Sequence, residues 1–255
     1  MKKKIKIHED FKNSEADLLN LIDQFSTSGK FIADGGRNLI KSFNLNGEEV
    51  AVKSFKKPGL INKIIYTYFR KSKAQRSYEY ARILEQNNLG TPQPIAYVCE
   101  FDFLGLTSSY YVCRNINADL TYRELVQEPN FPNHETILRQ FVRFTHSLHE
   151  NNILFKDHSP GNTLIKKNAE NNYSFYLVDL NRMTFKNLSF EERIKNFSRL
   201  TPKKEMVAVM SDEYAKITGL DYQNVFNEMW QQTSRFQEKF FRKRRFKKRF
   251  FFWRK

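Results

Sequence analysis

The chain has 255 residues, 40% of them hydrophobic and 28% charged, which is the composition of a globular protein and not of a disordered one. Its formal net charge at pH 7 is +15, and its two cysteines, Cys99 and Cys113, match no disulfide framework, zinc motif or redox motif. No apolar run follows the basic N-terminal residues, which argues against a signal peptide, and no stretch is apolar enough to span a membrane. We therefore expect a cytoplasmic protein.

Residues 1–114 are predicted to form a small, strand-rich N-terminal lobe with one main helix. Asn46-Gly47 predicts a hairpin turn, because both residues tolerate positive φ. Residues 72–88 are predicted to be helical, because apolar side chains recur there at helical spacing and Gly90 follows. Strands are expected at residues 31–40, 41–45, 50–53, 95–100 and 108–113.

Residues 115–234 are predicted to form a larger, mostly helical C-terminal lobe, entered through a linker at 115–119. A hairpin is expected over residues 163–179, with its turn at 168–172. Ser189 and Glu192 form a capping-box pattern that predicts the start of a helix. Further helices are expected at residues 134–150, 201–219 and from 221 into the C-terminal segment.

Residues 235–255 form a basic, aromatic tail with eleven Lys or Arg and one acid, Glu238. The tail therefore carries +10, which leaves about +5 for the other 234 residues, by subtraction from +15. Lys and Arg interleaved with Phe and Trp suit the anionic face of a membrane, which we favour. Nucleic acid is a less favoured partner, and a solvated helix end is the alternative that needs no partner.

The residues that could take part in a reaction lie in two segments of the C-terminal half. Leu154 to Asn162 reads LFKDHSPGN, and 17 residues after Asn162 comes Asp179 within LVDLN. Phosphoryl transfer needs a carboxylate to accept or orient the attacking hydroxyl, and oxygen ligands that hold Mg²⁺ against the phosphates. Asp157, Asn162 and Asp179 supply these groups.

These segments resemble the signatures of protein kinases. Asp157 to Asn162 resembles the D-x-x-x-x-N catalytic loop, and Asp179 resembles the Asp of D-F-G. The resemblance implies that Asp157 is the catalytic base and that Asn162 and Asp179 hold Mg²⁺. Asn181 could add a polar contact near the metal, and His158 is expected to pack or to contact substrate.

The N-terminal half carries the matching nucleotide-binding pattern. Val50-Ala51-Val52-Lys53 resembles V-A-I-K, which implies that Lys53 contacts the α- and β-phosphates of ATP. Glu79 resembles the acid that pairs with this lysine, with Glu85 as the alternative. Gly35 and Gly36 are expected to form a turn that covers the phosphates.

Several departures from protein kinases narrow the resemblance. Phe155-Lys156-Asp157 stands in place of H-R-D, Leu180-Asn181 follows Asp179 in place of Phe-Gly, and no A-P-E segment follows. The phrases GGRNLIKSF, KDHSPGN and LVDLNRM look closest to the bacterial lipopolysaccharide kinase family. That resemblance implies an α+β, two-lobe protein-kinase-like fold and phosphate transfer from ATP to a Kdo or heptose sugar of a lipid-linked substrate.

The resemblance also implies where the protein acts in the cell, and it leaves alternative functions open. A lipid-linked sugar acceptor and the tail at residues 235–255 together predict peripheral attachment to the inner face of the bacterial inner membrane. A kinase for another small molecule or for protein is one alternative. A catalytically silent, kinase-like membrane scaffold is another, and a basic nucleic-acid-binding protein is a third.

Overall fold

The structure is a computed structural model that describes residues 2–34 and 38–250, apart from the side chains of residues 34, 247, 248 and 250. The chain divides into two compact units. Unit 1 comprises Met1–Asn117 together with Val178–Arg182, and unit 2 comprises Ala118–Leu177 together with Met183–Lys255. The short segment Val178–Arg182, which contains Asp179, thus packs with the N-terminal unit although the chain on both sides of it belongs to unit 2.

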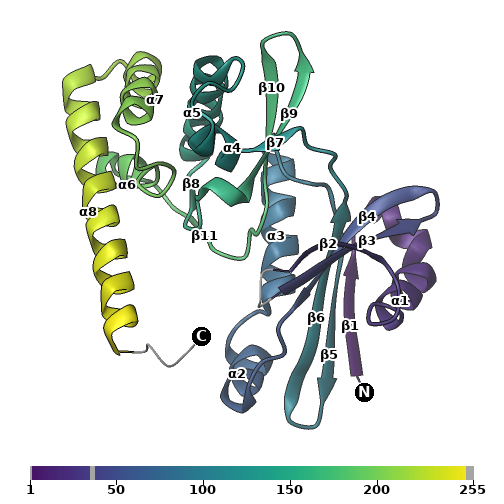
Figure 1. Cartoon of the computed structure of the whole chain (residues 1–255). Helices are drawn as coiled ribbons and strands as arrows, with labels where there is room; N and C mark the ends of the chain where they lie inside the picture. Colours follow the sequence, from purple (N-terminus) through teal and green to yellow (C-terminus); the bar gives the residue numbers. More distant parts are fainter. Residues whose placement is uncertain (1, 35–37, 251–255) are drawn as a thin grey trace. The chain divides into compact units, whose positions relative to one another are not determined.

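Unit 1 is built on a six-stranded antiparallel sheet with the order β1-β5-β6-β4-β3-β2 (Figure 1). The turn at Asn46 and Gly47, both with positive φ, joins β3 to β4 as their residue types predict. The strands are β1 (Lys2–Ile7), β2 (Lys30–Asp34), β3 (Asn38–Leu45), β4 (Glu48–Phe55), β5 (Pro94–Asp102) and β6 (Gly105–Arg114).

Two helices cover opposite faces of this sheet. Strand side chains alternate between faces, so Val50 and Val52 of β4 pack in one core cluster with Leu18 and Leu21 of α1 (Glu15–Asp23). On the other face, the ring of Tyr97 contacts Tyr78 of α3 (Lys73–Gln86) at 5.5 Å between centroids. Alternation therefore places Lys53 on the α3 face.

Three short helical segments complete unit 1. A 3-10 helix, η1 (Glu9–Ser14), leads into α1. Between β4 and α3 the chain forms α2 (Leu60–Ile64), which continues directly into a π-helical turn, η2 (Ile65–Phe69).

Unit 2 combines two small sheets with five helices among its described residues. Its sheets have the orders β10-β9-β7 and β11-β8. Ile137 and Phe141 of α5 pack in one core cluster with Met210 and Tyr214 of α7. The elements are β7 (Leu120–Thr121), α4 (Tyr122–Gln127), α5 (His134–Glu150), β8 (Ile153–Phe155), a 3-10 turn η3 (Pro160–Asn162), β9 (Thr163–Ala169), β10 (Asn172–Leu177), β11 (Met183–Phe185), α6 (Phe190–Lys195), α7 (Lys204–Thr218) and α8 (Tyr222–Phe250).

The helices and hairpins expected from the sequence are confirmed, with ends that shift by a few residues. The capping box at Ser189 and Glu192 begins α6, and Gly219, with φ of 69°, ends α7. The expectation of one helix in the N-terminal region was incomplete, because α1 and the α2–η2 segment were not anticipated. Along the described residues, no helix combines the length and the apolar character that crossing a bilayer requires.

Candidate active site

Lys53 and Asp179 meet in unit 1. The ammonium of Lys53 lies 2.8 Å from Oδ1 of Asp179, and the Lys53 side chain is only 13% exposed. Nδ2 of Asn181 donates to the same Oδ1 at 2.6 Å. The backbone of Asp179 is left-handed, with φ of 60°, a conformation that Asp and Asn tolerate better than most residues. The carboxylate is thus oriented by a charge, an amide and a constrained backbone.

Glu79 on α3 has other partners in this structure. It accepts hydrogen bonds from Nζ of Lys71 at 2.8 Å and from Nε2 of Gln75 at 3.0 Å. The alternative acid, Glu85, accepts from Arg82 at 2.7 Å. The structure therefore shows Lys53 paired with Asp179, and the pairing of Lys53 with Glu79 stays a prediction. Gly35 and Gly36, expected to cover the phosphates, lie outside the described residues.

Asp157 and Asn162 lie on one loop of unit 2, between β8 and β9. Nδ2 of Asn162 donates to the backbone oxygen of Asp157 at 2.8 Å, which fixes the amide plane and makes Oδ1 the atom that can act as a ligand. The short 3-10 turn η3, with Pro160 in its first turn, turns the chain so that Asn162 contacts Asp157, five residues earlier. The loop thus positions one carboxylate and one amide oxygen as the sequence pattern requires.

Two arginines that the sequence reasoning missed lie at this loop. Nη1 of Arg199 donates to Oδ1 of Asp157 at 2.8 Å and to the backbone oxygen of Lys156 at 3.0 Å. A Cβ added at Gly161 would lie 2.6 Å from Nη2 of Arg123, so this glycine allows the guanidinium to approach the loop. Arg199 is 42 residues from Asp157 in the chain, and no local pattern links the two.

Buried polar groups pack beneath the surface of the β8–β9 loop and make hydrogen bonds there. Asn196 donates from Nδ2 to the backbone oxygen of Phe155 at 2.8 Å, and its Oδ1 lies 3.2 Å from Nε2 of His149. His158 is fully buried, stacks on Phe141 at 5.3 Å between ring centroids, and lies 3.3 Å from the hydroxyl of Thr145. Of the two roles considered for His158, the structure thus shows packing.

Burial also fixes the charge state of these histidines. It lowers the pKa of His158 to about 3 and that of His149 to about 4. Both imidazoles are therefore neutral near pH 7. The role of Asp157 as the catalytic base stays a prediction.

Each unit presents chemical groups that phosphoryl transfer uses. Unit 1 offers a lysine that can bind phosphate and a carboxylate, Asp179, while unit 2 offers Asp157 and the amide oxygen of Asn162. Carboxylate and amide oxygens are hard ligands, which fit Mg²⁺. Among the described residues no three His, Cys, Asp or Glu side chains form a metal-binding group.

Comparisons with known proteins identify a family and a fold for the chain. The model of the lipopolysaccharide kinase (Kdo/WaaP) family matches residues 36–228. No curated protein sequence matches the chain significantly. Among solved structures, the chain resembles WaaP in complex with acyl carrier protein, with a TM-score of 0.64 and 13% identity over 92% of this chain and 97% of that one. This likeness shows that the fold is protein-kinase-like.

Proposed function

The chain belongs to the lipopolysaccharide kinase (Kdo/WaaP) family, and we propose that it is an ATP- and Mg²⁺-dependent kinase that phosphorylates a hydroxyl of a Kdo or heptose sugar in the lipopolysaccharide inner core. The observation that carries this proposal is the pair Lys53–Asp179, at 2.8 Å in unit 1 and within the matched residues. A lysine that can bind phosphate and a carboxylate that can bind Mg²⁺ are two of the groups that a metal–nucleotide site uses, and here they lie side by side.

Each polar group has one proposed role. Lys53 would bind the α- and β-phosphates, so that phosphate replaces Asp179 as its partner. Asp179 and Asn162 would hold Mg²⁺, which neutralises charge on the phosphates when bound. Asp157, held by Arg199, would orient the sugar hydroxyl and accept its proton. Glu79 would have to leave Lys71 and Gln75 to pair with Lys53.

The C-terminal helix supports a location at a membrane. On α8 three phenylalanines are 45–55% exposed between basic residues: Phe240, Phe241 and Phe246. Aromatic side chains settle at lipid headgroups, and each nearby Lys or Arg contributes about 1 kcal/mol at an anionic surface. We infer that residues 235–255 attach the enzyme to the cytoplasmic face of the inner membrane, where a lipid-linked acceptor is concentrated.

A transfer assay with a panel of acceptors tests the proposal. The purified chain is incubated with γ-labelled ATP and Mg²⁺, and with Kdo-bearing lipid A, heptose-bearing lipid A or a generic protein as acceptor. Label in either lipid, and its absence when Mg²⁺ is chelated, supports the proposal. Label in the protein alone would favour a protein kinase, and no label with any acceptor would favour a catalytically silent scaffold.

A further inference from the structure

Unit 1 carries an exposed apolar surface that the nucleotide site does not use. Most of it lies on α2 and η2, where Ile61 is 76% and Phe69 82% exposed. The turn between β5 and β6 adds Phe103, which is 94% exposed. We call this surface the apolar patch, and it comprises Leu60, Ile61, Ile64, Tyr68, Phe69, Phe103 and Leu104. Soluble proteins rarely expose so many large apolar side chains together, which indicates a partner surface.

The two parts of the apolar patch are fixed to each other. Nζ of Lys63 on α2 lies 2.7 Å from Oδ2 of Asp102, and the backbone N–H of Leu106 donates to Oγ1 of Thr67 at 3.0 Å. Gly105, with φ of 121°, allows this approach, because a Cβ there would lie 2.4 Å from Oγ1 of Thr67. Figure 1 shows α2 beside the β5–β6 turn. Phe103 and Leu104 therefore extend the surface of α2 and η2.

The chain around the apolar patch is strongly basic. From residue 56 to residue 76 it has seven Lys or Arg and no acid: Lys56, Lys57, Lys63, Arg70, Lys71, Lys73 and Arg76. Lys63 pairs with Asp102 and Lys71 with Glu79, both from outside this segment. Within the described parts of the chain, no salt bridge joins Lys56, Lys57 or Arg70 to an acid. The patch therefore has a net positive border.

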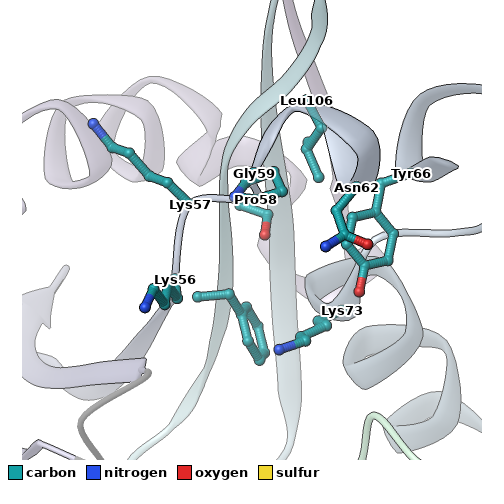
Figure 2. A pocket seen from close by; sticks show the side chains of 10 residues that line it. Lys56, Lys57, Pro58, Gly59, Asn62, Tyr66, Lys73 and Leu106 are labelled. Carbon is teal, nitrogen blue, oxygen red and sulfur yellow. The ribbon is translucent and has the colours of Figure 1, made fainter. Parts of the chain in front are cut away.

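Two hollows with basic linings border η2. A cavity of about 210 Å³ is lined by three lysines, Lys56, Lys57 and Lys73, together with Tyr66 (Figure 2). Figure 2 shows Lys57 extending away from Asn62 and Tyr66. A second hollow, of about 300 Å³, is lined by Tyr66 and by Lys4, Arg70 and Lys71. Basic side chains therefore line both of the hollows that Tyr66 of η2 borders.

We propose that the apolar patch is a second membrane-docking surface, whose apolar side chains enter an anionic bilayer while the flanking lysines and Arg70 meet lipid phosphates. Exposed apolar and aromatic side chains bordered by Lys and Arg are the combination that binds at the headgroup boundary of anionic membranes. The inference rests on the proposed function insofar as a lipid-linked acceptor requires the enzyme at that surface. It is independent of α8, since all of its residues belong to unit 1.

Vesicle partitioning of the full-length chain tests this proposal. Two double variants are compared with wild type. One carries Ile61→Glu and Phe69→Glu, and the other carries Lys56→Glu and Lys57→Glu. All four side chains are exposed, so the fold should tolerate the changes. Leu220→Glu, at a site that is 45% exposed in unit 2, is the matched control for adding an acid at an exposed apolar position. The probes are vesicles of phosphatidylcholine with or without a third of phosphatidylglycerol.

Both double variants should bind the anionic vesicles at least about tenfold more weakly than wild type, and the control should not. Unchanged partitioning of both double variants, or no binding of wild type to anionic vesicles, would overturn the proposal. Mg²⁺–ATP thermal shifts of the same proteins separate this result from the proposed function. Weaker vesicle binding with a normal nucleotide shift supports the docking surface. A wild-type chain that docks through the patch but transfers no phosphate refutes only the proposed function.

Discussion

Replacing Asp179 by Asn isolates the charge at the centre of the proposed nucleotide site. Asn tolerates the left-handed backbone at this position, where φ is 60°, and its oxygen can still accept from Asn181. The substitution thus removes the negative charge beside Lys53 while it keeps size and backbone geometry. We expect two separate effects, one on the free energy of unfolding and one on nucleotide binding.

The structure sets the size of the first effect. At 2.8 Å and an effective dielectric constant of about 20, the gross attraction between Lys53 and Asp179 is about 6 kcal/mol. Desolvation offsets most of this attraction, because the Lys53 side chain is 13% and the Asp179 side chain 30% exposed. We expect a net loss of about 2 kcal/mol, between the values for exposed and fully buried pairs. A loss of this size lowers the midpoint of thermal unfolding by roughly 4–8 °C.

The second effect is measured by thermal unfolding with Mg²⁺–ATP. At a nucleotide concentration of about 100 times Kd, binding to the folded state stabilises wild type by about 2.7 kcal/mol, which raises the midpoint by roughly 5–10 °C. In Asp179→Asn the Mg²⁺-dependent part of this rise should disappear, because a neutral amide is a weaker metal ligand than a carboxylate.

Asp102→Asn is the matched control for this experiment. The pair Lys63–Asp102 has a similar distance, 2.7 Å, and similar exposures of 17% and 27%, in the same unit. The control removes the charge of an ion-paired Asp in the same unit and should keep the full Mg²⁺–ATP rise. An Asp179→Asn protein that retains the wild-type rise would refute the assignment of Asp179 as a metal ligand.

Three further predictions concern unit 2. Arg199→Lys should lower kcat by about tenfold to a hundredfold with little change in the KM for ATP, because a single ammonium holds Asp157 less rigidly than a guanidinium does. Equal kcat values for Arg199→Lys and wild type would contradict a positioning role for Arg199. His149 and His158 have pKa values of about 4 and 3 in the folded protein, below the value near 6.5 of an unfolded chain, so acid should favour unfolding as the pH falls below about 6.5. Urea titrations should show a loss of roughly 2 kcal/mol per histidine at pH 5 relative to pH 7, and His158→Gln should show a smaller loss. Deleting residues 235–255 should weaken binding to anionic vesicles and leave the Mg²⁺–ATP thermal shift in place; unchanged vesicle binding would refute the attachment of α8 to membranes.

Local signals predicted the elements that depend on local chemistry. Asn46-Gly47 specifies its turn because both residues adopt positive φ, and Ser189 with Glu192 specifies the start of α6 because the two side chains cap the helix. The V-A-V-K pattern placed Lys53 on a strand, and the alternation of β4 then fixes the face that it occupies.

Contacts between distant residues were not predictable in the same way. Strand β1 depends on pairing with β5, about ninety to a hundred residues later, and its lysine-rich sequence gives a weak strand signal on its own. The α2–η2 segment keeps its apolar side chains exposed, so its sequence carries no burial pattern. Arg199 reaches Asp157 across 42 residues, and its role follows only from the folded loop.

The most direct test of the central claim is mass spectrometry of an inner-core acceptor after incubation with the purified chain and Mg²⁺–ATP. Kdo-bearing and heptose-bearing lipid A are compared with wild-type protein and with Asp157→Ala, whose nucleotide binding is confirmed beforehand by its thermal shift. The account predicts one added phosphate on a core sugar with wild type and none with Asp157→Ala. An unmodified acceptor with wild type, or equal phosphorylation by Asp157→Ala, would contradict it.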